Sequence, residues 1–309
     1  MAGELIGFEE RGTHQGDHIV RGTAADGMIR AFAITARETV QTAHENHSTS
    51  PLVTAALGRL MMAGQMMGVM FKGPDELVTL TVRGDGPIGG LTVTANTHGQ
   101  VKGFANHPNV WRAHNALDKL DVGGGIGAGT LTVIRDQPGI EPYSSAVELV
   151  SGEIGDDLTS YFVLSDQVPT SVGVGVLVNG DTSVKQAGGF IIQLMPGYYD
   201  YLVDELEHNL AGVFSVTSLL EDGMTPTDIL QYLLRGLDYQ QLEVVPAQFH
   251  CGCNEERATR AVVALGRDEL RDMVEKGEPA QAHCHFCGKD YVLETSRLEE
   301  LLAQASSQK

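Results

Sequence analysis

Apolar and polar residues alternate in several short segments of the chain, and each segment of this kind predicts a half-buried strand. The clearest runs cover residues 78–82, 91–95, 100–104 and 129–135, and longer β-rich runs cover 143–151, 171–179 and 187–194. Residues 17–35 alternate on both sides of Asp26-Gly27, a dipeptide that is typical of a β-hairpin turn. Several of these strands are neighbours along the chain, which favours local pairing.

Two helices are predicted directly after this hairpin. Residues 36–47 form the first, and Ser50-Pro51 begins the second, with serine as the N-cap and proline at the first helical position. The second helix is rich in methionine, namely Met61, Met62, Met66, Met67 and Met70. Such a helix can act as a promiscuous binding surface, but its glycines allow neighbouring elements to approach closely. We therefore expect a buried core helix here, and a further helix at residues 154–164.

Two glycine-rich segments raise the question of a phosphate site. Residues 84–90 lack the Lys-Ser/Thr of a P-loop, and the chain resumes as a strand where a phosphate site needs a helix. We interpret this segment as a turn between two strands. The three consecutive glycines at 123–125 are expected to be flexible and exposed, without a nucleotide site.

Strands outnumber helices over residues 1–196, which predicts an α+β core domain with a mixed or antiparallel sheet and packed helices. Ser165 and Asp166 are adjacent rather than arranged around a base, and no Gly-x-Ser-x-Gly motif occurs. His44 and His47 share a helix but lack the Glu of a zinc-protease motif, so we expect a solvated helix end. The sequence does not indicate an enzyme.

Residues 197–243 are predicted to form an acidic, metastable helical linker. Nine acidic side chains stand against one Lys or Arg, Arg235, over these 47 positions. Helical spacing is plain at 198–210, and again after the capping box Thr225-Pro226-Thr227-Asp228. Short amphipathic helices depend on docking their apolar face, and excess like charge makes undocking easier. An ordinary helical connector is the alternative.

The chain has four cysteines, and they form two close pairs near its C-terminus, Cys251-x-Cys253 and Cys284-x-x-Cys287. Two such pairs can surround one ion, and Zn²⁺ prefers this tetrahedral thiolate environment. Gly288 frees the backbone after the second pair, so amide groups can point at the sulfurs. We therefore predict one Zn²⁺ per chain, held by all four cysteines.

Other uses of these cysteines fit less well. A disulfide framework is typical of small secreted chains, and a thioredoxin-like pair would open a helix after a strand. Here the second pair lies between two predicted hairpin strands, residues 280–283 and 290–294. The neighbouring histidines are left outside the ligand set because four sulfurs already fill it; they are His250, His283 and His285.

Residues 244–309 form the third predicted unit, a small zinc-binding α/β domain. Asn254 caps a helix that extends to residue 265, a second helix ends at Gly277, and Ser296 caps the last. These elements provide little hydrophobic core. A small domain of this kind usually needs a metal or disulfides to stay folded.

Net charge narrows the range of partners. The chain has a formal net charge of −19 at pH 7, with 40 acidic and 21 basic side chains. We therefore expect no cationic surface for nucleic-acid phosphates. No apolar run approaches the roughly 20 residues needed to cross a bilayer, so no membrane association is expected. Residues 1–5 lack the basic and apolar regions of an export signal. Reduced, metal-held cysteines then point to the cytoplasm.

Together these features resemble the HslO family, the redox-regulated bacterial holdases also called 33 kDa chaperonins. The resemblance spans nearly the whole chain and rests on residues 48–51, 84–89 and 165–170 and, above all, on the order and separation of the four cysteines. Two departures are mild. Asp166 stands where the family usually has Glu, and Lys102-Gly103-Phe104 stands where Arg-Gly-Tyr is common. We expect neither to touch the metal site.

The resemblance implies a redox-activated chaperone that works without ATP and forms a homodimer when active. Oxidants such as peroxide or hypochlorous acid would convert the thiolates to the disulfides Cys251–Cys253 and Cys284–Cys287 and release the zinc. The terminal domain would then unfold, and the linker would lose what it packs on. Unfolding client proteins would bind the apolar face of the linker and the surface it covered on the core. Candidate contacts are Leu202, Leu206, Leu210, Phe214, Leu230 and Leu233.

Two other functions would use the same cysteines. A zinc-ribbon protein that binds nucleic acid needs Lys and Arg around the metal. The arginines of this region are mixed with at least as many acidic residues; they are Arg257, Arg260, Arg267 and Arg271. A zinc hydrolase needs an open coordination position, and four cysteines leave none.

Overall fold

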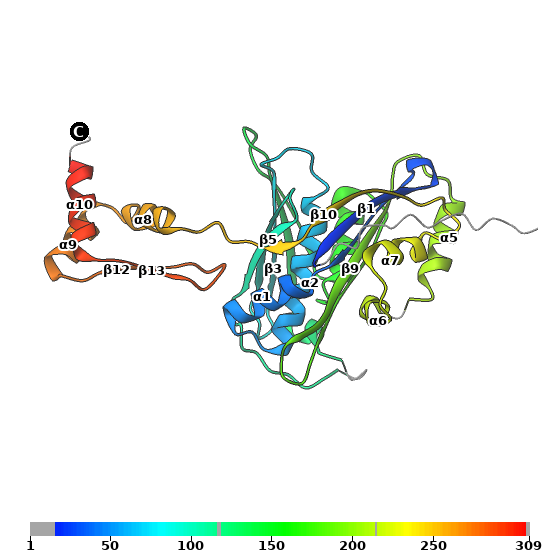
Figure 1. Cartoon of the computed structure of the whole chain (residues 1–309), viewed down its shortest axis with the longest axis horizontal. Coiled ribbons are helices and arrows are strands. Elements are labelled where there is room, and N and C mark those ends of the chain that lie inside the picture. The colour runs from blue at the N-terminus through cyan, green and yellow to red at the C-terminus, as the bar shows by residue number, and fades with distance from the viewer. Residues whose placement is uncertain (1–15, 116–118, 214, 307–309) are drawn as a thin grey trace, which may run out of the picture.

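The computed structural model describes residues 16–115, 119–213 and 215–306. Its elements form two sheets with helices between and outside them, and a separate C-terminal unit at one end (Figure 1). The expected α+β class is confirmed by this arrangement.

The first sheet is antiparallel throughout, in the order β10-β1-β2-β9-β8. Its strands are β1 (His18–Ala24), β2 (Ile29–Thr35), β8 (Thr170–Val178), β9 (Val184–Leu194) and β10 (Gln240–Pro246). A short 3₁₀ turn, η1 (Ala25–Gly27), joins β1 to β2, with φ of 53° at Asp26 and 87° at Gly27. The hairpin predicted at Asp26-Gly27 is confirmed, and positive φ explains the residue types found there.

The second sheet has the order β11-β5-β4-β3-β6-β7. Its strands are β3 (Leu77–Gly84), β4 (Leu91–Asn96), β5 (Gln100–Ala105), β6 (Gly129–Asp136), β7 (Tyr143–Glu148) and β11 (Gln248–Phe249). Neighbouring strands are antiparallel except for β11, which is parallel to β5. The glycine-rich residues 84–90 join β3 to β4, so their interpretation as a turn between strands is confirmed.

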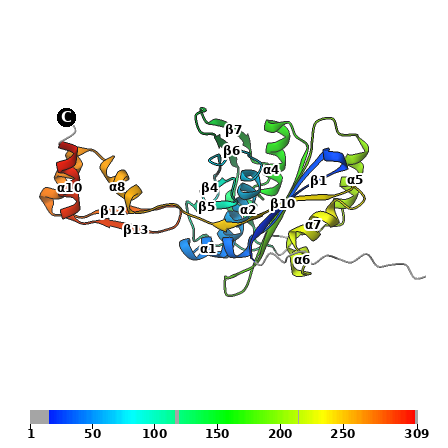
Figure 2. The same ribbon diagram turned by 45° about the horizontal axis from the view of Figure 1, so that its top comes forward.

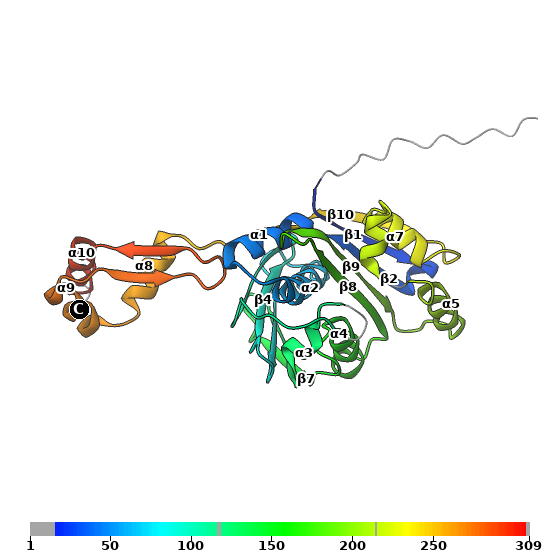
Figure 3. The same cartoon turned by 90° about the horizontal axis from the view of Figure 1, so that it is seen from below.

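Helix α2 (Pro51–Gly68) lies between the two sheets and forms the centre of the core (Figure 3). Ser50 caps it as predicted, because its side chain accepts a hydrogen bond from the Val53 amide. The methionines of this helix are buried, so the core-helix interpretation is confirmed. Helix α1 (Arg37–His47) packs beside α2 and against β9.

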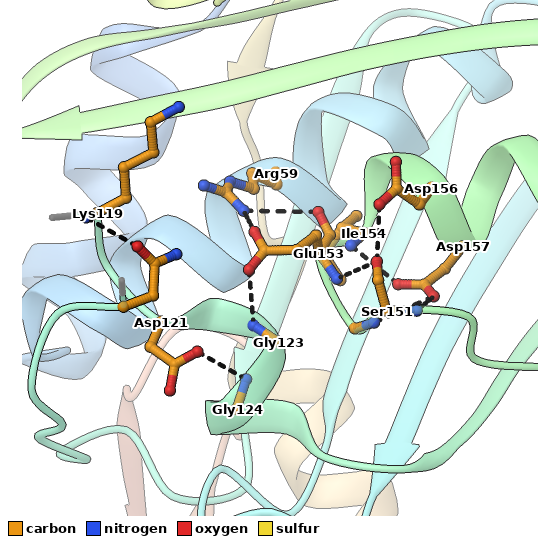
Figure 4. A network of polar contacts seen from close by, with 12 residues as sticks. Arg59, Lys119, Asp121, Gly123, Gly124, Ser151, Glu153, Ile154, Asp156 and Asp157 are labelled. Carbon is orange, nitrogen blue, oxygen red and sulfur yellow. Dashed lines mark hydrogen bonds and ion pairs between the residues drawn. The ribbon is translucent and has the colours of Figure 1, made fainter. Parts of the chain in front are cut away.

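The glycines at 123–125 lie in a short helix, α3 (Val122–Ile126), so the expectation of a flexible, exposed loop is wrong. The carboxylates of Asp121 and Glu153 accept hydrogen bonds from the first amides of this helix (Figure 4). Glu153 also forms an ion pair with Arg59 of α2. The support from Glu153 comes from a distant part of the chain, which explains why the local pattern did not reveal a helix.

Residues 154–164, predicted as one helix, are divided into two elements. Helix α4 (Gly155–Tyr161) continues into a π-helical turn, η2 (Phe162–Asp166). Gln167 ends this turn in the left-handed conformation, with φ of 57°. A π turn followed by a left-handed residue other than glycine is uncommon and strained.

Three short helices cover the outer face of the first sheet. They are α5 (Tyr201–Leu210), α6 (Val216–Glu221) and α7 (Pro226–Leu233). Helix α7 packs on β1 and β2 (Figure 3). Helix α6 packs on β8 and β9. The predicted capping box is present, since Thr225 and Asp228 exchange hydrogen bonds between side chain and amide in both directions.

The hydrophobic cluster under these helices joins the linker to the first sheet. The sheet contributes Val20, Ala31, Ala33, Phe190 and Ile192, and the helices contribute Leu202, Leu206, Leu220, Ile229, Leu230 and Leu233. Among the described residues, the cluster includes none from the C-terminal unit. The expectation that the linker covers apolar surface on the core is therefore confirmed, whereas the expectation that its apolar side also packs on the terminal domain is wrong.

The boundary predicted between residues 243 and 244 falls inside β10, which pairs with β1. After β10 ends at Pro246, the chain continues through one residue into β11, which pairs with β5 of the second sheet. Val244 and Val245 suit a strand, and Pro246 is tolerated at the end of an edge strand. The chain therefore runs along both core sheets between α7 and the first cysteine.

The C-terminal unit extends from the core at the end opposite to α5 (Figures 1 and 2). It contains α8 (Glu255–Val263), α9 (Arg267–Lys276), β12 (Ala280–His283), β13 (Asp290–Leu293) and α10 (Thr295–Ser306). Asn254 caps α8 as predicted. Helix α10 begins at Thr295, so Ser296 lies inside it and does not cap it. The small core of this unit consists of Val262, Leu270, Ala280, Leu293, Leu298 and Leu301.

Candidate metal centre

The four cysteines meet at one point of the C-terminal unit. Cys251 and Cys253 lie between β11 and α8, and Cys284 and Cys287 lie in the turn of the β12–β13 hairpin. The Sγ atoms of Cys251 and Cys284 are 3.6 Å apart, and those of Cys253 and Cys287 are 3.3 Å apart. All four sulfurs lie within 4.8 Å of one another, and all four thiols are free.

This cluster has the size and composition of a tetrahedral metal site. With metal–sulfur bonds of about 2.3 Å, four sulfurs around one ion would lie about 3.8 Å apart. Within the described part of the chain, no histidine or carboxylate joins the group. An all-sulfur donor set suits Zn²⁺ among the common protein metals. The four residues therefore fit the expected ion, and they can hold one metal ion.

The flanking histidines make other contacts. Nδ1 of His283 lies 2.7 Å from a carboxylate oxygen of Asp290 on the facing strand. The ring of His285 lies against the ring of Phe104, with 5.9 Å between their centroids. The amide of His250 donates to the carbonyl oxygen of Val101 in β5. None of the three is part of the sulfur cluster.

Hydrogen-bond donors around the cluster favour negative charge on sulfur. The hydroxyl of Tyr291 donates to Sγ of Cys253 at 3.2 Å. Although burial acts in the opposite direction, this bond and the neighbouring thiols lower the pKa of Cys253 to about 7. Burial raises the pKa of Cys287 to about 12, against the effect of a hydrogen bond from the Lys289 amide. Four thiolates this close together would repel one another, so a bound cation would be needed to hold all of them charged.

The turn after Cys287 is packed closely against the core. Gly288 has a φ of +68°, and its amide donates to the carbonyl oxygen of Cys284 at 2.8 Å. A Cβ atom on Gly288 would lie 2.6 Å from the carbonyl oxygen of Asn46 in α1. Glycine is therefore required for its backbone conformation and for the space it leaves.

His47 links this turn to the core. Its Nε2 lies 3.0 Å from the carbonyl oxygen of Phe286 and 3.1 Å from that of Gly103 in β5, so one N–H is shared between two acceptors. Burial lowers the pKa of His47. The expected solvated helix end is therefore wrong for His47. It is also wrong for His44, whose Nδ1 contacts the hydroxyl of Thr54.

The side chain of Phe286 packs on β5. Its ring meets the ring of Phe104 edge to face at 5.3 Å, and Nζ of Lys102 lies 4.5 Å from its centroid. Lys102 and Phe104 are two of the positions at which the chain departs from the family pattern. Neither residue belongs to the sulfur cluster, but both contact Phe286, in the turn that carries Cys284 and Cys287, so this departure lies closer to the metal site than expected.

The described members of the predicted client-binding set belong to α5 and α7, on the other side of the core from the cysteines (Figure 1). Leu202, Leu230 and Leu233 are fully buried, and Leu206 is 6% exposed. Leu210 is partly buried against the same cluster. Phe214 lies outside the described residues. In this state, therefore, the described members of the set face the core and not the solvent.

The backbone connects the cysteine cluster to these helices by a short path. Only His250 separates β11 from Cys251, and β11 is two residues long. The next strand, β10, exposes most of its side chains, including Leu242, which is 58% exposed. Strands with few buried side chains are among the first to separate from a sheet.

Basic side chains of the C-terminal unit are paired with acidic neighbours. Arg260 pairs with Glu256, and Arg271 pairs with Asp268. These pairs reduce the positive charge that a nucleic-acid surface would require, so they do not favour the zinc-ribbon alternative.

Known proteins resemble this chain over most of its length. The sequence pattern of the family described as Hsp33 protein matches residues 17–294. The chain belongs to the Hsp33 family. The 33 kDa chaperonin of Agathobacter rectalis is 49% identical over 92% of this chain and 99% of its own length. That of Bacillus pumilus is 45% identical over 92% of this chain and 98% of its own length.

A solved Hsp33 structure has the same fold. The crystal structure of the 33 kDa chaperonin from Thermotoga maritima, a heat shock protein 33 homologue, matches with a TM-score of 0.88. It is 33% identical and covers 95% of this chain and 100% of that chain. The resemblance inferred from the cysteine pattern is confirmed, and this Hsp33 chain is a chaperone. Among its described helices, none is both long and apolar enough to span a membrane.

Proposed function

We propose that this Hsp33 chain is a redox-regulated, ATP-independent holdase that binds unfolding proteins under oxidative stress. In the reduced state, all four cysteines would hold one Zn²⁺ as thiolates. The bound ion would supply folding free energy to the C-terminal unit, about 10–16 kcal/mol in small zinc-binding peptides. The small hydrophobic core of that unit supports this role, because so few buried side chains rarely stabilise a domain alone.

Oxidation would remove the metal ligands. We propose the disulfides Cys251–Cys253 and Cys284–Cys287, in keeping with the family resemblance. For each disulfide, two thiols lose two electrons and two protons, and one peroxide molecule takes them up and leaves as two waters. A disulfide sulfur is no longer a thiolate, so the oxidised cluster no longer offers the charged ligands that a metal cation needs.

Unfolding of the C-terminal unit would destabilise the linker, because the two are joined by the strands β10 and β11. The hairpin turn would lose its contact with His47, and Cys251 would no longer hold the end of β11 in place. The two-residue β11 and the exposed β10 could then separate from β5 and β1. Helix α7 precedes β10 directly in the chain, so it would lose its tether. The nine acidic residues of the linker would favour its undocking.

Undocking would expose two apolar surfaces. One is the leucine face of α5 to α7, and the other is the sheet face that includes Val20, Phe190 and Ile192. Unfolding clients expose apolar surface of the same kind, and association would remove both from water. Binding of this type needs no ATP. We propose that the active form is a homodimer and that it acts in the cytoplasm.

This proposal depends most on the position of the four-thiol cluster. The cluster directly follows β11, and the chain before β11 leads through β10 to the helices α5 to α7, whose apolar side is covered by the first sheet. A client-aggregation assay on reduced, zinc-loaded protein and on peroxide-treated protein tests it. The oxidised protein should suppress aggregation of a heat-unfolding client and release one zinc per chain, and the reduced protein should do neither. Treatment with a thiol reductant and zinc should reverse both effects. Equal protection by the two forms would contradict the proposal.

A further inference from the structure

A cavity of about 490 Å³ lies at the C-terminal end of α2, between the two sheets. Its walls come from β2 and β9 of the first sheet, from β6 and β7 of the second, and from η2. The proposed switch uses none of its residues. Its volume is in the range of small-molecule sites, about 300–1,000 Å³.

The cavity is positively charged in a strongly acidic chain. Arg30 of β2 and Arg135 of β6 line it, and Asp166 of η2 is the acidic side chain among its described lining residues. Arg135 forms an ion pair with Asp166, and Arg30 forms none among the described residues. The lining groups therefore carry a formal charge of +1, two arginines minus one carboxylate, although the chain as a whole carries −19.

The guanidinium of Arg30 is held in place but not saturated. Its Nε and Nη2 donate to Oε1 of Gln193 at 3.1 and 2.6 Å, and Gln193 is itself 1% exposed. Nη1 of Arg30 has no hydrogen-bond partner in the described part of the chain. Arginine presents its donors in a rigid planar fork that matches an oxyanion. The fixed side chain therefore offers an anion a preformed set of N–H donors.

Burial makes the charge of Arg30 costly in the absence of an anion. Burial lowers the pKa of Arg30, the positive charges of Arg21 and Arg135 lower it further, and the nearby carboxylate of Asp166 acts in the opposite direction. A negative group placed between Arg30 and Arg135 would relieve both effects.

The remaining walls are largely apolar. Met67, Met70 and Phe71 line one side, at the end of α2. A second hollow shares Tyr143 and Ser165 with the first and continues along β7; its lining includes Glu148 and, beyond that strand, Val150 and Leu164. The side chains of Val150 and Leu164 are 67% and 66% exposed. A ligand with an anionic head thus has apolar surface available for its body.

We propose that this cavity binds a small amphipathic anion, a carboxylate attached to an unbranched apolar chain. The carboxylate lies between Arg30 and Arg135, and the chain lies against Met67, Met70 and Phe71. A carboxylate is favoured because its single charge matches the single positive charge of the lining groups. The strained turn at Gln167 forms part of the same wall segment, since Asp166 and Val168 on either side of it line the cavity.

Calorimetric titration of the reduced, zinc-loaded protein tests this proposal without any substitution. Octanoate should bind saturably at one site per chain. Octanol lacks the charge and octylammonium has the opposite charge, so each should bind at least about tenfold more weakly, the value of one charge-assisted hydrogen bond. Acetate lacks the apolar chain, so it should also bind at least about tenfold more weakly, because each buried CH₂ group contributes about 0.8 kcal/mol. Equal affinity for octanoate and octanol, or no saturable octanoate binding, would overturn the proposal.

Location and residue dependence are tested on the same protein. In methyl-labelled protein, octanoate should shift the methyl signals of Met67 and Met70 most. Arg30→Gln should weaken octanoate binding at least about tenfold, whereas Arg83→Gln, which changes an exposed arginine of β3, should leave it unchanged. Shifts confined to other methionines, or equal affinity of a folded Arg30→Gln variant, would overturn the assignment.

Discussion

Nε2 of His47, in the last turn of α1, lies 3.0 Å from the carbonyl oxygen of Phe286, the residue before Cys287. This contact joins the metal-binding turn to the core directly. Around it, Phe104 and Lys102 pack on the Phe286 ring, and Gly288 fits against Asn46. We refer to these four contacts between the core and the hairpin together as the docking contact. It gives the core a means of sensing whether the cysteine hairpin is folded.

Phe286→Ala should weaken the docking contact without removing a cysteine. It deletes one edge-to-face aromatic pair and one cation–π contact, which together contribute on the order of 1–2 kcal/mol. We expect one zinc per chain as before, but activation at lower peroxide concentration. The readouts are zinc content and protection of a client at graded peroxide doses. Val292→Ala, at a 52% exposed position on β13, is the matched control. An unchanged dose response for Phe286→Ala would show that docking does not restrain the switch.

Gly288→Ala and Gly277→Ala form a second matched pair. Both glycines have left-handed φ values, +68° and +69°, so both substitutions carry the same backbone cost of about 1–2 kcal/mol. Only a Cβ atom at position 288 would collide with the core, whereas nothing lies within 4 Å at position 277. We expect Gly288→Ala to lower the thermal stability of the reduced, zinc-loaded protein more. Equal shifts in melting temperature would mean that the contact with Asn46 contributes nothing.

Leu230→Ala should loosen α7 from the first sheet. Leu230 is fully buried, and truncation of a buried leucine costs about 2–5 kcal/mol. Because α7 is short, this loss should be enough to undock it and expose the sheet face. The reduced variant should therefore already protect a client from aggregation. Tyr201→Ala, which truncates a 55% exposed side chain of α5, should behave like the unmodified chain. A reduced Leu230→Ala variant that is folded and inactive would argue against the sheet face as the client surface.

Acidification should weaken the docking contact. Burial lowers the pKa of His47 below its ordinary value of 6.5, hydrogen bonds to Phe286 and Gly103 act in the opposite direction, and the charge of His283 lowers it again. The docked state therefore binds fewer protons than the undocked state just below pH 6.5. Docking is strongest above that pH and weakens as the pH falls through the lowered pKa. The amide signal of Gly288 reports docking by NMR.

His47→Gln provides the control for this pH dependence. Glutamine keeps a donor near the two carbonyls but does not titrate, so the Gly288 signal should change much less between about pH 7.5 and pH 5.5. If the variant and the unmodified chain showed the same profile, another group would be responsible.

Local signals in the sequence were sufficient for much of the fold. The Asp26-Gly27 turn, the Ser50 and Asn254 caps and the capping box at Thr225 each depend on neighbouring residues, and each is present. The spacing of the cysteines likewise indicated their convergence, because two short pairs can bring four sulfurs together without knowledge of the rest of the fold.

Contacts between distant segments could not be predicted in this way. His47, Lys102 and Phe104 meet the cysteine hairpin only because α1 and β5 lie side by side in the core. The glycine helix α3 depends on Glu153, which follows it only after two further strands, β6 and β7. The linker sequence predicts helices with an apolar face, but it does not identify the surface on which that face packs, which is the first sheet.

The central claim is that unfolding of the C-terminal unit releases α5 to α7 from the first sheet. Amide hydrogen exchange on reduced, zinc-loaded protein and on peroxide-treated protein measures this coupling most directly. We predict that oxidation removes protection from α8 to α10, from β10 and from α7, while α2, β3 and β4 remain protected. Retained protection of β10 and α7 after the C-terminal unit has lost its own would contradict the account.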